Sequence, residues 1–223
     1  MGRSEGARIV GIDEAGRGAW LGPLVVGAFA APADRTEALR AAGARDSKQL
    51  TAAARTAVYE RLPALGDCHS VALAPAEIDR RVTRGELNEL EAEAFARLVR
   101  ETAPSVAYLD ACDADARRFG RRVARLAGPG VRIVARHRAD VDLPFVGAAS
   151  IVAKVRRDRA IAALADELGA DIGSGYPSDP RTVRFVRDAV PAGAPRPPWL
   201  RASWATTQRV IPAGPARPLD AFE

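Results

Sequence analysis

IVGIDEAGRGAW, residues Ile9 to Trp20, is the stretch that decides the fold. Its apolar start is typical of a buried strand, and it leads directly into two adjacent carboxylates, Asp13 and Glu14. Adjacent side chains of a strand point to opposite faces unless a turn redirects one of them. Taken alone, such a pair is more often a turn or cap feature than a functional one. A role in chemistry therefore depends on what the rest of the chain brings to this strand end.

The glycines after this pair almost match two phosphate-binding fingerprints. Gly11 and Gly16 have the outer spacing of a P-loop, but Arg17 and Gly18 stand where Lys and Ser or Thr are required. Gly16, Gly18 and Gly22 miss the dinucleotide-binding spacing by one residue. The sequence therefore disfavours a nucleotide cradle at this turn.

Length and composition indicate one main domain with a polyanionic partner. The chain has 223 residues, 48% of them hydrophobic, which is enough for one sizeable core. Its 33 Lys and Arg against 28 Asp and Glu leave a net charge of +5, which suits nucleic acid, although a solvated, arginine-rich surface would look the same.

Cysteine usage and the apolar runs indicate a cytoplasmic protein. Only Cys68 and Cys112 are present, so neither a disulfide framework nor a cysteine-based zinc site is expected. The first apolar run is broken by Asp13 too early for a signal peptide, and no run approaches the roughly 18 residues of a membrane span. We expect neither secretion nor a membrane partner.

The periodicity of the chain alternates between strands and helices, which predicts the α/β class. Thr83, with Glu86 three residues later, predicts a capping box for one helix. The expected strands cover 9–12, 24–30, 71–73, 106–109 and 131–135, and the expected helices cover 51–62, 86–101, 115–126 and 146–168.

The C-terminal stretch from Pro191 to Pro218 is rich in Pro, Ala and Arg but contains Trp199 and Trp204. Two tryptophans favour an extended segment packed on the domain over a free linker. Residues beyond about Thr207 are expected to form a loose tail.

Carboxylates also follow other core elements of the prediction. Asp110 ends an apolar strand in YLDACD, and Asp140 lies just ahead of the long helix. Holding such charges together with Asp13 would be costly unless a cation offset their repulsion. All-oxygen ligation favours magnesium or manganese over zinc.

Six motifs, in this order along the chain, resemble ribonuclease HII, the type 2 ribonuclease H. The SGYPSDPRT form is similar to the archaeal branch of that family. The motifs are GIDEAGRG (11–18), DSKQL (46–50), LDACD (109–113), ADVDLPFVGAASIVAKVRRDR (139–159), GSGYPSDPRT (173–182) and LRASWAT (200–206).

The resemblance implies a ribonuclease H-like fold, in which a central five-stranded mixed sheet is flanked by helices and followed by a small C-terminal helical portion. The first and fourth strands are neighbours in that fold, so Asp13 and Asp110 would face each other. It also implies a catalytic domain over 1–175, a C-terminal segment over 176–206 packed on it and a tail over 207–223.

The resemblance further implies the site residues. The glycine turn would press its backbone against the 2'-hydroxyl of a ribonucleotide, where side chains would block the approach. Such a site reads sugar rather than base sequence. The implied catalytic and metal-binding residues are Asp13, Glu14, Asp110 and Asp140, and the implied substrate-binding residues are Gly16, Arg17, Gly18, Lys48, Lys154 and Tyr176.

Several positions depart from the family pattern or leave alternatives open. Ala19 replaces the usual proline, and Trp20 beside it is unusually bulky. Asp142 offers an alternative to Asp140 as the fourth ligand, although the motif aligns Asp140. His137 lies near Asp140 and is more often a solvated histidine than a proton carrier.

The implied reaction is phosphodiester hydrolysis assisted by Mg²⁺ or Mn²⁺. The implied substrates are RNA/DNA hybrids and duplex DNA with single embedded ribonucleotides, cut on the 5' side of the ribonucleotide by a monomer. Two alternatives are another metal nuclease of the same fold that cuts DNA and a non-catalytic nucleic-acid-binding protein. The second should have lost at least one of the acids, and all are present.

Overall fold

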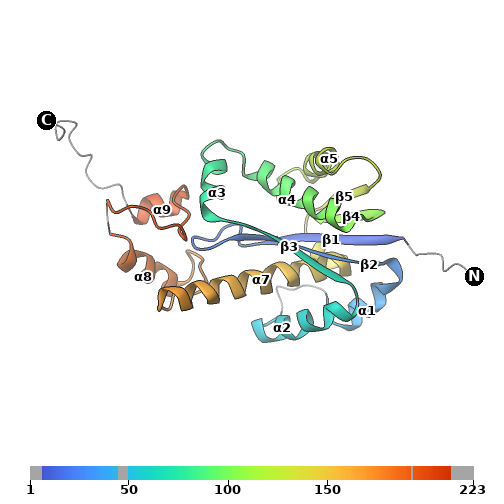
Figure 1. Cartoon of the computed structure of the whole chain (residues 1–223), viewed down its shortest axis with the longest axis horizontal. Coiled ribbons are helices and arrows are strands. Elements are labelled where there is room, and N and C mark those ends of the chain that lie inside the picture. Colours follow the sequence, from blue (N-terminus) through green and yellow to red (C-terminus); the bar gives the residue numbers. More distant parts are fainter. Residues whose placement is uncertain (1–6, 45–49, 192, 212–223) are drawn as a thin grey trace, which may run out of the picture.

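A computed structural model of the chain describes residues 7–44, 50–191 and 193–211. Within these residues, five strands form one mixed sheet in the order β3-β2-β1-β4-β5 (Figure 1). β1 is antiparallel to β2 and parallel to β4. This sheet confirms the α/β class and the mixed five-stranded core. The bounds of the strands are β1 (Arg8–Ala15), β2 (Leu24–Pro32), β3 (Asp67–Leu73), β4 (Val106–Asp110) and β5 (Arg132–Arg136).

The central strand β1 is longer than its apolar run predicts. It continues through both carboxylates to Ala15, because β2 pairs with it along its whole length, with Asp13 opposite Gly27 and Glu14 opposite Val26. The two acids therefore lie on a strand that has a hydrogen-bonded neighbour, and not in the turn that follows it.

Helices cover both faces of the sheet (Figure 1). α4 and α5 pack on one face, where Phe95 and Phe119 meet edge to face at 5.1 Å. α7 crosses the other face together with α1 and α2. The helices are α1 (Thr36–Ala41), α2 (Ala52–Arg61), α3 (Pro75–Val82), α4 (Leu87–Thr102), α5 (Ala116–Ala127), α6 (Ala139–Asp142), α7 (Pro144–Leu168), α8 (Pro180–Ala189) and α9 (Ala205–Val210).

The four predicted helices correspond to α2, α4, α5 and α7, but the predicted capping box is wrong. Thr83 is the C-terminal cap of α3, and its hydroxyl donates to the carbonyl of Arg80. Glu86 is the N-terminal cap of α4 and makes no side-chain cap hydrogen bond. The pattern misleads because it spans the end of one helix and the start of the next.

The C-terminal segment contributes to a third apolar cluster. Leu200 and Ile211 are buried there with Trp20 and Leu21 from the end of the glycine turn, and Trp199 and Trp204 pack against them. α9 continues to Val210, past the point where the sequence indicates the start of a tail. Helices of the described part of the chain lack the combination of length and apolar character that crossing a membrane requires.

Candidate active site

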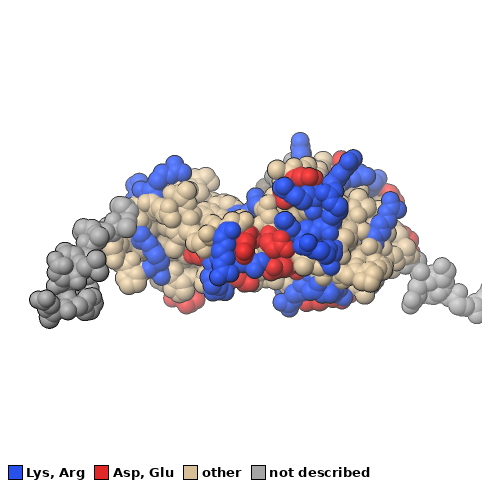
Figure 2. All heavy atoms as spheres, turned by 90° about the horizontal axis from the view of Figure 1, so that it is seen from above, with Lys and Arg blue, Asp and Glu red and all other residues tan. Residues whose placement is uncertain are grey.

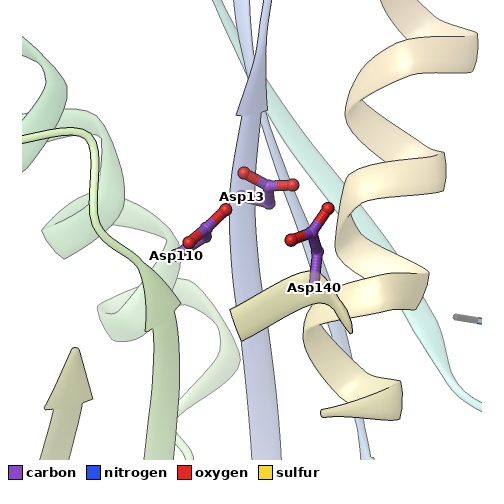
Figure 3. Close-up of side chains that lie close together, drawn as sticks. All are labelled: Asp13, Asp110 and Asp140. Carbon is purple, nitrogen blue, oxygen red and sulfur yellow. The ribbon is translucent and has the colours of Figure 1, made fainter. Parts of the chain in front are cut away.

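Three aspartates converge at one end of the sheet (Figure 3). Each offers a carboxylate oxygen, and these oxygens all lie within 4.8 Å of one another. Asp13 comes from β1 and Asp110 from the end of β4, which are adjacent because Ile12 is paired with Leu109 in the parallel ladder. Asp140 comes from α6, the short helix after β5.

A tight backbone connection brings Asp140 to this cluster. Arg138 has a left-handed conformation with φ of 56°, and the next amide, that of Ala139, donates to an oxygen of Asp110 at 3.1 Å. The chain thereby turns back over β4 and buries Asp140 completely. Asp142, the alternative ligand, is exposed and is not in the group of three.

The electrostatics of the cluster fit a divalent cation. Burial raises the pKa of Asp13 well above its usual value, and the neighbouring charge of Glu14 raises it further. A hydrogen bond from Ser150 and the charge of Lys154 only partly oppose this effect. Three converging carboxylates with oxygen ligands alone are typical of a Mg²⁺ or Mn²⁺ site, because such ions are hard cations.

Glu14 lies beside the group of three and is not part of it. Its amide donates to Asp13 at 2.7 Å, and its own carboxylate lies within the electrostatic reach of Glu91 and Asp110. Burial is the main cause of its raised pKa. Of the four predicted ligands, the structure thus brings three together and leaves the fourth at the edge of the same charged cluster.

The crowding of these carboxylates predicts a stability response to metal. Millimolar Mg²⁺ or Mn²⁺ should raise the melting temperature by about 5–10 °C at one hundred times the dissociation constant, because the ion binds only the folded chain. Asp13→Asn should abolish most of this rise and also raise the melting temperature without metal, since it removes one buried charge. Thermal scans with and without the ions test both effects; a wild-type response in the variant would exclude Asp13 as a ligand.

The two glycines of the turn after β1 have different reasons to be glycine. Gly16 has φ of +91°, and a Cβ there would lie 2.3 Å from Nε of Arg157. Gly18 is exposed, and a Cβ there would have no atom of the described residues within 4 Å. The protein itself thus excludes a side chain at Gly16, whereas Gly18 borders open space that a ligand could enter.

Arg17, between these glycines, is bound to α4 through its side chain. Its Nε donates to Glu91 at 2.9 Å, and its Nη2 donates to Asn88 at 2.6 Å. Glu91 is fully buried and was not singled out from the sequence. A signal exists, because Glu91 falls on the helix face of Leu87 and Ala94, where an unpaired acid would be costly.

Two of the other predicted substrate-binding residues, Tyr176 and Lys154, contact buried residues of α7. The guanidinium of Arg157 lies over the Tyr176 ring, with 4.4 Å from Cζ to the ring centroid. Arg157 itself is buried, with 3% of its surface exposed. Lys154 donates to Ser150 on α7 at 2.9 Å, next to Asp13. Lys48 lies outside the described residues. His137 is exposed, with Nδ1 at 3.3 Å from the carbonyl oxygen of Ala111.

Comparison with known proteins gives one consistent family. The model of the family described as Ribonuclease HII matches residues 10–207. A ribonuclease HII of Cenarchaeum symbiosum is 44% identical, over 92% of this chain and 98% of the relative.

Solved structures agree with the sequence relatives. The crystal structure of ribonuclease H2 from Pyrococcus horikoshii has a TM-score of 0.83 and 37% identity, covering 92% of this chain and 97% of that one. The RNase HII in the PCNA:RNase HII complex from Archaeoglobus fulgidus has a TM-score of 0.78 and 35% identity, covering 88% and 94%. Since these matches cover nearly the whole length of this chain and of each matched protein, this chain belongs to the ribonuclease HII family.

Proposed function

We propose that this chain is an endoribonuclease that hydrolyses the RNA strand of RNA/DNA hybrids and cuts duplex DNA 5' of a single embedded ribonucleotide. The products would be a 5'-phosphate and a 3'-hydroxyl. The observation that carries the proposal is the convergence of Asp13, Asp110 and Asp140 within 4.8 Å beside a glycine turn with open space at Gly18.

The proposed catalytic and metal-binding set is these three aspartates together with Glu14. Bound Mg²⁺ or Mn²⁺ supplies the activation of a water molecule and the stabilisation of the leaving 3'-oxygen. The chain itself brings the acids together from β1, β4 and α6 before substrate arrives, which reduces the reorganisation that the reaction needs. Lys154 on α7 adds a positive charge next to Asp13 that suits a phosphate contact.

The proposed reader of the sugar is the backbone of the turn from Gly16 to Gly18. The hydrogen bonds from Arg17 to α4 keep its side chain occupied, which supports a role for the turn's main chain in the approach to the 2'-hydroxyl. Tyr176 is proposed to pack at the junction of ribonucleotide and deoxyribonucleotide, and Lys48 to contact phosphate.

The test uses purified protein and a duplex DNA with one ribonucleotide, with and without Mg²⁺ or Mn²⁺. We expect one metal-dependent cut on the 5' side of the ribonucleotide and no cut in the all-deoxy duplex. Cleavage of the all-deoxy duplex would favour a DNA endonuclease of the same fold. Binding with no cleavage of either duplex or of a hybrid would favour a non-catalytic protein.

A cationic surface near the site supports the nucleic-acid substrate. Lys and Arg gather on the face above α5, beside a smaller group of acids (Figure 2). On α5, Arg118 pairs with Asp113 and Arg122 with Glu89. The exposed arginines of α5, β5 and the following turn that form no ion pair with any described residue are Arg117, Arg121, Arg132, Arg136 and Arg138.

Replacing Arg117 and Arg121 by Ala should therefore reduce the salt dependence of binding. The slope of log K against log salt should fall by about two units, one for each lost phosphate contact. The control is Arg40→Ala with Arg61→Ala, which removes the same charge from α1 and α2 on the other side of the sheet. Equal slopes for the two double variants would remove α5 from the interface.

We also propose that the chain acts as a cytoplasmic monomer, with a catalytic domain over 1–175 and a C-terminal segment over 176–206. One chain supplies all three converging aspartates, so the site needs no second copy. The relative from Archaeoglobus fulgidus was solved with PCNA, which makes a PCNA-type protein a candidate partner. Light scattering with and without such a protein tests both points.

A further inference from the structure

Arg201, from the C-terminal segment, is a fully buried arginine whose guanidinium donates hydrogen bonds to backbone carbonyls of the glycine turn. Its Nη1 donates to the carbonyl of Arg17 at 3.0 Å, and its Nε and Nη2 both donate to the carbonyl of Gly22 at 3.2 Å. A buried charge is costly unless it is fully hydrogen-bonded, and these bonds go to both arms of one turn. The guanidinium also lies over Trp204, with Cζ at 5.3 Å from the ring centroid.

The main chain around Arg201 pairs with the same turn. The amide of Arg201 donates to Trp20 at 2.9 Å, the amide of Gly22 donates to Trp199 at 2.9 Å, and Leu21 and Leu200 form an antiparallel bridge. The turn therefore does not hold its shape through its own contacts alone, because a segment almost 180 residues away along the chain closes it.

A carboxylate of α3 holds this segment in place. Asp79 accepts from the amides of Ala202 at 2.9 Å and of Ser203 at 3.0 Å, and also from the hydroxyl of Ser203. Charge-assisted bonds of this kind are stronger than neutral ones. Arg201 is thus fixed on one side by Asp79 through the backbone and on the other by the turn.

We propose that Arg201 is a positioning residue for ribonucleotide recognition, which keeps the turn around Gly18 at the distance that the 2'-hydroxyl requires. The inference rests on the proposed function of the turn. Arg201 acts through Arg17 and Gly22 and does not touch substrate. A misplacement of about 1 Å at such a site can lower the rate about a hundredfold, so loss of the hydrogen bonds from Arg201 to the turn should affect cleavage strongly.

The test compares Arg201→Gln and Arg201→Lys with the wild-type protein on a duplex with one embedded ribonucleotide and on a continuous hybrid. Arg201→Gln should lower kcat/KM by about 10- to 100-fold on the embedded ribonucleotide and less on the hybrid, which offers neighbouring registers. Arg201→Lys should recover part of the loss, because it restores the positive charge but not the planar guanidinium with its several N–H donors. The rise in melting temperature with Mn²⁺ should persist in both variants.

The matched control is Arg196→Gln. Arg196 belongs to the same segment and also donates to a backbone carbonyl, that of Ile211 at 2.7 Å, but among the described residues it makes no hydrogen bond to the turn. Arg196→Gln should leave the ratio of kcat/KM on the embedded ribonucleotide to kcat/KM on the hybrid unchanged. An equal change of this ratio in Arg196→Gln, or wild-type kcat/KM in Arg201→Gln, would overturn the positioning role.

Two further outcomes are decisive. If Arg201→Gln loses the response of its melting temperature to Mn²⁺, the decision rests on Asp79→Asn. The proposal requires that Asp79→Asn has a lower kcat/KM than the wild-type protein and that its melting temperature still rises with Mn²⁺. A wild-type kcat/KM in Asp79→Asn overturns the proposal. If the wild-type protein cuts the hybrid but not the embedded ribonucleotide, the proposed reading of single ribonucleotides fails, and an unchanged hybrid rate in Arg201→Gln then also rejects the role of Arg201.

Discussion

Asp13→Asn and Asp110→Asn are each expected to lower kcat by at least about a thousandfold, while the affinity for substrate remains within a few-fold. The loss of one ligand removes several kcal/mol of charge stabilisation in the transition state, and each 1.36 kcal/mol corresponds to a factor of ten. Substrate affinity depends mainly on phosphate contacts by cationic residues, which these substitutions leave in place. Single-turnover rates and binding isotherms on the same duplex separate the two quantities.

Asp142→Asn is the matched control for these variants. It removes an equal charge from the same short helix as Asp140, but Asp142 is exposed and outside the cluster. It should keep kcat within about twofold, as is typical of surface positions without a special role. Full activity in Asp13→Asn and Asp110→Asn, or a thousandfold loss in Asp142→Asn, would contradict the assignment of the acids.

The sheet was predictable from local sequence because each of its central strands contains a buried apolar run. Val10, Ile12 and Leu109 are completely buried, and their runs indicate strands without any partner being known. β3 was predicted only over its last residues. It is an edge strand whose first part, Asp67 to Ser70, is polar and partly exposed, so its extent follows from pairing with β2 and not from its own pattern.

The acids of the site were predictable individually, and their meeting required the topology. Asp13 lies near the end of β1 and Asp110 ends β4, about a hundred residues later, and only the pairing of β1 with β4 makes them neighbours. Asp140 depends on the left-handed residue Arg138, for which the sequence offers no signal, because arginine rarely adopts that conformation.

The buried charges around the turn show where sequence patterns carry least information. Arg157 and Arg201 look like surface residues in their motifs, since charged residues are mostly exposed, and Glu91 differs from them only in lying on the helix face of Leu87 and Ala94. Each is buried with a partner on another segment of the chain: Arg17 for Glu91, the Ser174 carbonyl and the Tyr176 ring for Arg157, and the carbonyls of Arg17 and Gly22 for Arg201. Long-range hydrogen bonds of this kind cannot be read from periodicity.

The difference between the two glycines of the turn makes Gly18 the sharper test of ribonucleotide recognition. A side chain at Gly16 would adopt an unfavourable φ and collide with Arg157, so a loss of activity there would report on the folding of the turn. A Cβ at Gly18 meets no described atom within 4 Å and needs no left-handed backbone. Gly18→Val should therefore fold normally and bind metal normally.

Gly18→Val is expected to lower kcat/KM on a single embedded ribonucleotide by about a hundredfold, because the branched side chain occupies the space through which the sugar approaches the backbone. Gly18→Ala should cause a smaller loss, since its single methyl group projects less far. The measurements are kcat/KM for both variants, together with the rise in melting temperature with Mn²⁺, which should match that of the wild-type protein. A graded loss with an intact metal response would locate the effect at the open side of the turn, whereas wild-type cleavage by Gly18→Val would show that the sugar is read elsewhere, even if Asp13 and Asp110 prove essential.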